Sequence, residues 1–234
     1  MIAVILAGGM SRRLGGVPKA GLLLEGQTLL ARTVNGAMAA IEQGFIQPAT
    51  GDGGEGAGAR IAVVGPVDKT RDWIRGARSH GQVLFVQEDP PYSGPAAGIA
   101  AGLAALAAQA LPALDEEADS GHVLVLACDM PRAGEIAVLL MDSLAGCKAG
   151  SGIMAVDDGR KQPLAGIYPL AALSAAVDAA RQAGKLENAS VFSLLASVFI
   201  KECVVPLGLS TDIDTWQDAH AQGIDAWPAE AEGQ

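Results

Sequence analysis

The sequence predicts an α/β fold in three layers, with a mostly parallel mixed sheet between two layers of helices. Short apolar runs alternate with segments of helical period, which is the pattern of repeated βαβ units. The runs are nearly continuous in Val, Ile and Leu, so we expect strands that helices cover on both faces. Aromatic residues make up 4% of a chain that is 50% hydrophobic. This balance favours a core of Val, Ile, Leu and Ala in closely packed helices and strands.

Four strands and four helices alternate over the first two thirds of the chain. The expected strands are residues 2–7, 61–65, 83–86 and 122–128. The expected helices are residues 29–41, 69–75, 95–110 and 135–144. Pro95 suits the first turn of the third helix. Ile99, Leu103 and Leu106 form one apolar stripe along that helix, which we assign to the core.

The last third of the chain adds further strands and helices. The expected strands are residues 151–156, 164–168 and 200–205, with Pro163 at the start of the second. The expected helices are residues 170–182, 191–196 and 215–222. Residues 47–60 combine Gly, Pro and acidic residues without an apolar period, which predicts a surface loop. The length suits one domain, which we place at residues 1–228, followed by a disordered tail at residues 229–234.

The composition limits the partners and the compartment of the protein. The net charge of -10 argues against a nucleic-acid partner, because such binding depends on Lys and Arg that neutralise phosphates. Cys128, Cys147 and Cys203 form no C-x-x-C pair, which indicates reduced thiols rather than disulfides or a zinc site. The first strand has no basic flank and runs directly into a glycine-rich loop, which is unlike a signal peptide. These features favour a cytoplasmic protein.

Residues 96–114 lack charge for long enough to raise the question of a membrane span. The segment is mostly Ala and Gly and carries Gln109 and Pro112, which favours a buried helix. Gly94, Gly98 and Gly102 imitate the spacing of a membrane dimerisation motif, but the same spacing lets a helix lie close to a sheet. We therefore expect no membrane partner.

A glycine-rich loop with three cations follows the first strand, where residues 6–19 are LAGGMSRRLGGVPK. Glycines let the backbone approach a ligand, and Arg12, Arg13 and Lys19 can hold phosphates. The spacing fits neither the P-loop nor the dinucleotide fingerprint. A merely flexible loop would not explain why cations collect at the carboxyl end of a strand, where α/β proteins bind ligands. The loop is therefore a candidate phosphate site.

Asp129 follows the apolar strand at residues 122–128, and Pro131 stops that strand. A carboxylate in this position lies at the ligand-binding edge of the sheet. Mg²⁺ prefers hard oxygen ligands and usually takes one or two carboxylates together with substrate phosphates. A single Asp after a strand is also a common helix N-cap. The residues alone leave both interpretations of Asp129 open.

The loop L-A-G-G-x-S-x-R-[ML]-G-x-x-x-K resembles the signature loop of the molybdenum cofactor guanylyltransferases and their nucleotidyltransferase relatives. Further matches follow in the same order: Glu88-Asp89, Gly94-Pro95-Ala96-Ala97-Gly98, Cys128-Asp129-Met130-Pro131, Gln162-Pro163-Leu164 and Asp212-Ile213-Asp214-Thr215. Together they span nearly the whole chain. The resemblance implies a Rossmann-like nucleotidyltransferase fold. It also implies an enzyme that transfers GMP from GTP to the phosphate of Mo-bound molybdopterin, with release of pyrophosphate.

The resemblance further implies roles for single residues. Backbone groups at the end of the first strand would contact guanine and ribose, Gly65 would contact the nucleotide and Asp89 would bind the guanine side. The implied nucleotide-binding set is Leu6, Ala7, Gly8, Gly9, Lys19, Gly65, Asp89 and Asp129. The implied catalytic set is Arg13 and Lys19, which would hold the triphosphate, and Asp129. The implied cofactor is Mg²⁺, with Asp129 and Asp214 as ligands.

The chain departs from the family pattern near its end. Family members often carry Asn-Ile-Asn-Thr-Pro where this chain has Asp-Ile-Asp-Thr-Trp at residues 212–216. Asp212 and Asp214 alternate with Ile213, so in extended chain both carboxylates would point to one side and could meet a metal. Which of them contacts metal stays open, because Asp214 or Thr215 equally suits a cap of the following helix.

The implied reaction needs no general base, because a phosphate nucleophile is already ionised and catalysis rests on positioning and charge neutralisation. In agreement, His80, His122 and His220 lie in unrelated segments, and none precedes a Ser or Cys nucleophile. Relatives that use CTP tend to carry L-A-A-G where this chain has L-A-G-G, which favours GTP. Residues 162–164 also favour GTP and suit the pterin side, where Tyr168 either stacks on the ring or belongs to the core.

Two other classes of function stay open at this stage. One is a nucleotidyltransferase of the same fold that uses CTP or activates a sugar phosphate. The other is a noncatalytic nucleotide-binding adapter that delivers the cofactor, although Asp129 counts against it. The implied partners are GTP and molybdopterin as substrates, and a molybdenum-insertion enzyme or a cofactor-accepting apoenzyme.

Overall fold

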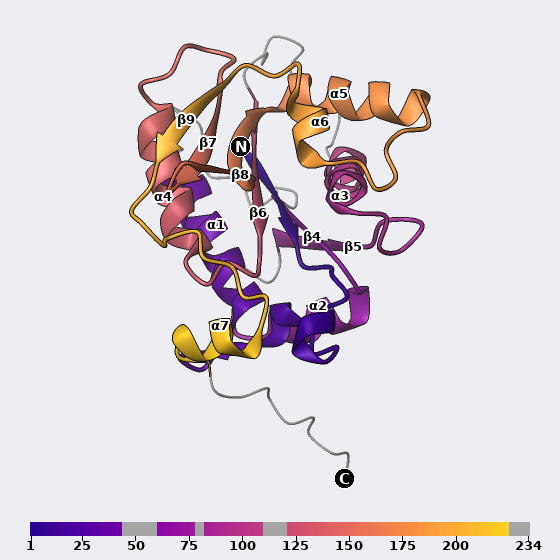
Figure 1. Cartoon of the computed structure of the whole chain (residues 1–234). Helices are drawn as coiled ribbons and strands as arrows, with labels where there is room; N and C mark the ends of the chain where they lie inside the picture. The colour runs from indigo at the N-terminus through magenta and orange to yellow at the C-terminus, as the bar shows by residue number, and fades with distance from the viewer. Residues whose placement is uncertain (44–59, 78–81, 110–120, 225–234) are drawn as a thin grey trace, which may run out of the picture.

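The computed structural model describes residues 1–43, 60–77, 82–109 and 121–224 (Figure 1). Its large sheet has seven strands in the order β5-β4-β1-β6-β8-β7-β9. Their bounds are β1 Ile2–Leu6, β4 Ile61–Val64, β5 Val83–Val86, β6 His122–Ala127, β7 Gly152–Asp157, β8 Arg160–Pro169 and β9 Ile200–Val204. All neighbouring pairs are parallel except those of β8, which is antiparallel to both β6 and β7. The mostly parallel mixed sheet is therefore confirmed.

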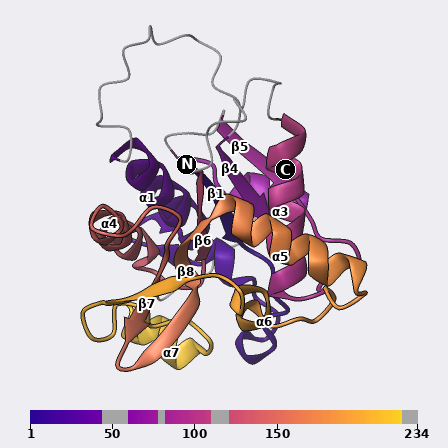
Figure 2. The same ribbon diagram turned by 90° about the horizontal axis from the view of Figure 1, so that it is seen from above.

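Helices cover both faces of this sheet, as Figure 2 shows. The helices α1 (Leu29–Gln43), α2 (Val67–Trp73) and α4 (Ala133–Leu144) pack on one face, and α3 (Pro95–Gln109), α5 (Leu170–Gln182) and α6 (Val191–Leu195) on the other. Along β1, the side chains of Ala3 and Ile5 belong to the hydrophobic core under α1, α2 and α4. The side chain of Val4 belongs to the core under α3, α5 and α6 on the opposite face. This alternation is the two-residue period of a strand, and it confirms the three-layer prediction.

Glycines set the distance between the layers. A Cβ atom on Gly36 of α1 would lie 2.3 Å from the Cα atom of Gly134 in α4, so these two helices touch backbone to backbone. On the other face, a Cβ atom on Gly102 of α3 would lie 2.7 Å from Val4. The glycines of α3 therefore serve close packing on the sheet, as predicted. In the described residues no helix is long and apolar enough to cross a membrane.

The strand predicted at residues 164–168 is longer in the structure, where β8 spans Arg160–Pro169. β8 begins at Arg160, and Pro163 lies inside it rather than at its start. The register with β7 shifts there, because Ala155 pairs with Gln162 whereas Met154 pairs with Gly166. Proline lacks the N–H of a sheet ladder, so it is tolerated within the strand at this irregularity.

Several smaller differences concern boundaries and short elements. α2 and α4 each begin two residues earlier than expected, and a hairpin of β2 (Leu23–Leu24) and β3 (Gln27–Thr28) was not predicted. The last helix, α7, spans Trp216–Ala221 and packs with a third, small core around Ile213. The predicted tail at 229–234 and boundary at residue 228 lie outside the described residues, as does most of the predicted loop at 47–60.

Candidate active site

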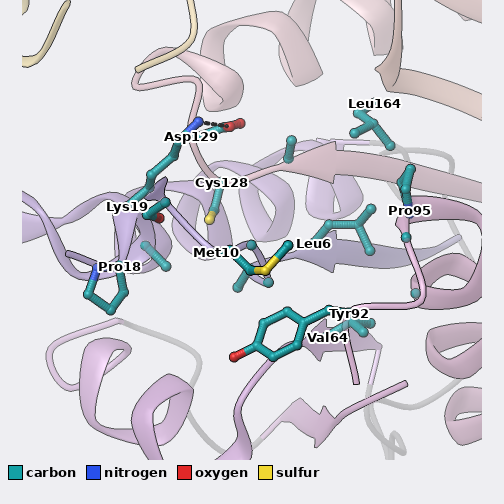
Figure 3. A pocket seen from close by; sticks show the side chains of 18 of the residues that line it. Leu6, Met10, Pro18, Lys19, Val64, Tyr92, Pro95, Cys128, Asp129 and Leu164 are labelled. Carbon is teal, nitrogen blue, oxygen red and sulfur yellow. Dashed lines mark hydrogen bonds and ion pairs between the residues drawn. The ribbon is translucent and has the colours of Figure 1, made fainter. Parts of the chain in front are cut away.

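A cavity of about 510 Å³ opens at the carboxyl ends of β1, β4 and β6 (Figure 3). The loop after β1 forms one wall. It turns back sharply, because Ser11, Gly15 and Gly16 have positive φ angles of 43°, 69° and 86°. The cavity is lined by Leu6, Ala7, Gly8, Gly9, Met10, Ser11, Arg12, Arg13, Pro18, Lys19, Ala20, Val64, Glu88, Tyr92, Gly94, Pro95, Gly98, Ala127, Cys128, Asp129, Leu164 and Asp214.

Four charged side chains meet at one end of this cavity. Lys19 Nζ lies 3.0 Å from Asp129 Oδ2 and 2.5 Å from Asp214 Oδ1. Arg13 Nη1 lies 2.9 Å from Asp214 Oδ2. The Lys19 side chain is 19% exposed and that of Arg13 is 73% exposed. The cluster therefore has an inner cation, which joins two carboxylates, and an outer cation at the rim.

The electrostatics of this cluster keep its charges in place. Burial lowers the pKa of Lys19, but the facing carboxylates Asp129 and Asp214 outweigh burial, so the pKa is raised from its ordinary value. The hydrogen bond from Lys19 lowers the pKa of Asp214. Burial, and then the like charge of Asp129, raise the pKa of Asp212. An additional cation would therefore be attracted to this end of the cavity.

The three aspartates could hold such a cation together. One carboxylate oxygen each from Asp129, Asp212 and Asp214 lies within 4.8 Å of the others. Ile213 fixes this arrangement, because its side chain is fully buried and its N–H donates to the Asp129 carbonyl oxygen at 3.0 Å. Carboxylate oxygens are the hard ligands that Mg²⁺ prefers. The donor set thus fits a divalent cation.

The N-cap residues of α4 and α7 show whether Asp129 and Asp214 cap these helices. The N-cap of α7 is Thr215, whose side chain accepts from the Asp218 N–H while the Asp218 carboxylate accepts from the Thr215 N–H. The N-cap of α4 is Arg132, which lies past Asp129. Neither Asp129 nor Asp214 therefore serves as the N-cap of these helices.

A buried carboxylate outside the cavity holds the segment that carries Asp212 and Asp214. Asp157, at the end of β7, is 7% exposed. It accepts hydrogen bonds from Gly208 N at 3.0 Å, and from Ser210 N and Oγ at 2.9 Å each. These bonds tie the loop after β9 to the sheet before the chain turns toward the cavity.

Not every predicted site residue reaches the cavity wall. Gly65 lies directly behind it, where a Cβ atom would come within 3.1 Å of the Ala7 carbonyl group, so glycine permits the close approach of β1 and β4. Asp89 is exposed and is not among the lining residues. Its neighbour Glu88 does line the cavity, although the family resemblance implies a nucleotide contact only for Asp89.

Other residues that the sequence singled out have structural roles. Tyr168 is 1% exposed, and its hydroxyl donates to the Pro163 carbonyl oxygen at 2.8 Å, so the idea that it stacks on a pterin is wrong. Cys128 is buried, and burial raises the pKa of its thiol strongly. His122 Nε2 lies 3.2 Å from the Ser151 carbonyl oxygen, whereas His80 is outside the described residues.

A family model described as the MobA-like NTP transferase domain matches residues 3–197. The chain belongs to this family. Comparison with curated protein sequences gives no match.

Solved structures support the same fold. The MobA-like chain is similar to molybdopterin-guanine dinucleotide biosynthesis protein A from Archaeoglobus fulgidus, at 19% identity and a TM-score of 0.53 over 95% of this chain and 96% of that chain. It is also similar to 2-C-methyl-D-erythritol 4-phosphate cytidylyltransferase from Francisella tularensis, at 14% identity and a TM-score of 0.58 over 95% and 99%. The same enzyme from Thermus thermophilus gives 18% identity and a TM-score of 0.53 over 94% and 96%. At these identities the likeness to solved structures shows the fold alone. The family match shows that the protein is a nucleotidyltransferase.

Proposed function

We propose that this MobA-like NTP transferase transfers GMP from GTP to the phosphate of molybdopterin and releases pyrophosphate. The product is the guanine dinucleotide form of the molybdenum cofactor. The observation that carries the proposal is the cluster of Arg13, Lys19, Asp129 and Asp214 at one end of the cavity. A nucleoside triphosphate and a divalent cation need both signs of charge at one place, and this cluster supplies them.

In this proposal Asp129 and Asp214 would hold Mg²⁺, and a carboxylate oxygen of Asp212 lies within 4.8 Å of theirs. When bound, Mg²⁺ neutralises phosphate charge and orients the reacting groups. Gly8 and Gly9 line the cavity without side chains, so a nucleotide could come close to their backbone N–H groups.

The protein side chains then act through position and charge. The pterin phosphate is ionised at neutral pH and attacks the α-phosphorus of GTP, so no residue has to remove a proton. The bond from the α-phosphorus to the bridging oxygen breaks, and pyrophosphate leaves with the negative charge. Lys19 and Arg13 neutralise that developing charge. Lys19 is a cation at neutral pH, and its carboxylate neighbours Asp129 and Asp214 raise its pKa further.

The choice of GTP rests on the L-A-G-G sequence of the loop and on the motif resemblance to guanylyltransferases. The fold similarity extends to cytidylyltransferases and does not separate the two nucleotides. We further propose that residues 1–228 act as one catalytic domain in the cytoplasm. A molybdenum-insertion enzyme or a cofactor-accepting apoenzyme would then be its protein partner.

The test is pyrophosphate release with Mg²⁺ and molybdopterin, with GTP, CTP and ATP offered separately. We expect release with GTP, and its loss in the Asp129→Ala variant. Asp178→Ala is the matched control, because Asp178 forms an exposed ion pair with Arg181 on α5. A preference for CTP would replace this proposal by a cytidylyltransferase, and GTP binding without turnover would favour the noncatalytic adapter.

A further inference from the structure

Three large apolar side chains are exposed on and beside β9, outside the active-site cavity. Phe199 precedes the strand and is 69% exposed, Val204 ends it at 81%, and Leu207 follows it at 80%. In the described part of the chain, no other element gathers three exposed residues of this kind. Apolar side chains grouped in this way on a surface mark a site of protein interaction.

β9 also presents unpaired backbone groups, because it is the last strand of the sheet and pairs with β7 alone (Figure 1). The Phe199 carbonyl oxygen and the Val205 N–H both form hydrogen bonds to β7. Backbone groups alternate in direction along a strand, so Ile200, Glu202 and Val204 direct their N–H and C=O groups away from β7. Among the residues that the structure describes, no strand pairs with this outer edge.

β9 lacks the features that usually keep an edge strand from pairing. It contains no proline, its register with β7 is regular, and its two charges have opposite signs. β5, the strand at the other edge of the sheet, has no exposed residue, whereas β9 exposes three of its five. Natural sheets protect such edges with prolines, bulges or covering segments. β9 is therefore suited to accept a further strand.

We propose that β9 pairs antiparallel with β9 of a second copy of this chain, so that two sheets join across a two-fold axis. Such an axis is perpendicular to the sheet, so one residue of β9 must face the same residue of the partner. If that residue is Glu202, Ile200 lies opposite the partner's Val204. These are the residues whose backbone groups point outward, so every outward N–H and C=O of β9 gains a hydrogen-bond partner. The inference goes beyond the proposed function and does not depend on it.

The same register covers exposed apolar residues on both faces of the sheet. Ile200 packs against the core under α3, α5 and α6, and the exposed Val204 would lie against the partner's Ile200 on that face. Val205 belongs to the core under α1, α2 and α4, and the exposed Phe199 would lie against the partner's Val205. Apolar pairs between neighbouring strands stabilise a sheet. Both cores would thus continue from one copy into the other.

The charges on β9 favour this register. Two Glu202 side chains at the axis would repel each other, but Lys161 Nζ lies 2.8 Å from Glu202 Oε1 in each chain and neutralises that charge. The neighbouring register would instead place Lys201 opposite itself. In the described residues Lys201 forms no ion pair, and Ile200 would then face the partner's Glu202. A surface whose charges and apolar residues match themselves fits a second copy of the chain.

The proposed dimer should be weak. β9 has five residues, and a ladder of this length buries less surface than a standard protein interface. We therefore expect a Kd of roughly 10–100 μM, so that the chain is a monomer at the low concentrations of a turnover assay. Lys19 and Asp129 lie on other segments, and turnover per chain should not require the dimer.

Sedimentation equilibrium of the full chain between about 1 and 300 μM tests the inference. We expect the wild-type mass to rise from that of one chain toward that of two. Val204→Pro removes an outward N–H and an exposed apolar side chain, while the bonds of β9 to β7 come from other residues and remain. Its Kd should be at least about 10-fold higher. Tyr92→Ser is the control, because it removes a large exposed side chain from the cavity wall and should keep the wild-type Kd.

A reversal of charge tests the register. Glu202→Lys would bring only cations to the axis, because Lys161 is already there, and should raise the Kd by about 10-fold or more. Lys161→Glu combined with Glu202→Lys restores opposite charges and should return the Kd toward the wild-type value. A double variant that stays as weak as Glu202→Lys overturns the pairing of Glu202 with itself.

The remaining outcomes also decide the inference. A wild type that stays monomeric at the highest concentration overturns it and leaves the edge of β9 to a strand of another protein. A dimer that Val204→Pro does not weaken overturns β9 as its interface. If Val204→Pro does not fold, Val204→Glu takes its place, since a side chain that is 81% exposed tolerates a charge. An unchanged Kd in that variant has the same meaning.

Discussion

The ammonium group of Lys19 joins two carboxylates that come from distant parts of the chain. It lies 3.0 Å from Asp129 Oδ2, after β6, and 2.5 Å from Asp214 Oδ1, before α7. One cation from the loop after β1 thus bridges two carboxylates at the charged end of the cavity. Removal of that cation would leave two carboxylates facing each other.

Lys19→Met should reduce turnover by at least about 100-fold, because a positioned charge is lost from the transition state. The half-buried carboxylates would then repel each other, and we expect a loss of about 1 kcal/mol in the free energy of unfolding. Mg²⁺ should raise the melting temperature of the variant more than that of the wild type, since it replaces the missing charge. Lys161→Met, which breaks an exposed pair with Glu202, is the control. Unchanged turnover in Lys19→Met would contradict the assigned role.

Arg13→Ala should separate function from stability. The Arg13 side chain is 73% exposed, and an exposed ion pair contributes roughly 0–1 kcal/mol, so the melting temperature should hardly change. The KM for the nucleotide should rise, or kcat should fall, by about tenfold, because a phosphate contact worth about 1.4 kcal/mol is lost. Arg75→Ala, which breaks a similarly exposed pair with Asp72, should leave the kinetics as they are. Equal kinetics in both variants would refute a phosphate role for Arg13.

Asp157→Asn should weaken the protein in a manner that depends on pH. Burial raises the pKa of Asp157, but the hydrogen bonds from Ser210 and Gly208 outweigh it, so the folded-state pKa is lowered. Asp157 therefore stabilises the fold fully above its unfolded pKa of about 3.9, and this contribution is lost as the pH falls through the folded value. Urea unfolding at pH 7 should show a deficit of about 1–3 kcal/mol for the variant. A deficit that grows on acidification would contradict this account.

Gly36→Ala should disrupt the contact between α1 and α4. The added Cβ atom would lie 2.3 Å from the Gly134 Cα atom, so the two helices must separate. The gain in helix propensity of about 1 kcal/mol does not offset a backbone clash, and we expect a net loss of about 2 kcal/mol in the free energy of unfolding. Gly134→Ala, with its nearest contact at 3.0 Å, should cost less. Thermal unfolding of the two variants tests this order.

Much of the fold could be predicted because its signals are local. The apolar runs that form β1, β4, β5 and β6 and the helical periods between them are contained in short stretches of sequence. The order of the strands is different. β8 lies between β6 and β7 and runs antiparallel to both, and the register shift beside Pro163 depends on pairing with β7. Such pairing depends on residues that are distant in the chain, so no local pattern records it.

The candidate site likewise has a part that the sequence predicts and a part that only the folded structure shows. The amino-acid sequence alone places Lys19 and Asp129 after strands at one edge of a parallel sheet, since that edge follows from strand direction. The folded structure was needed to show that Asp214 joins them, that Tyr168 is buried, and that Glu88 rather than Asp89 lines the cavity. Those features depend on how separate segments pack and on which neighbouring side chain a turn directs inward. Packing of this kind results from contacts across the fold, which the order of residues along the chain does not display.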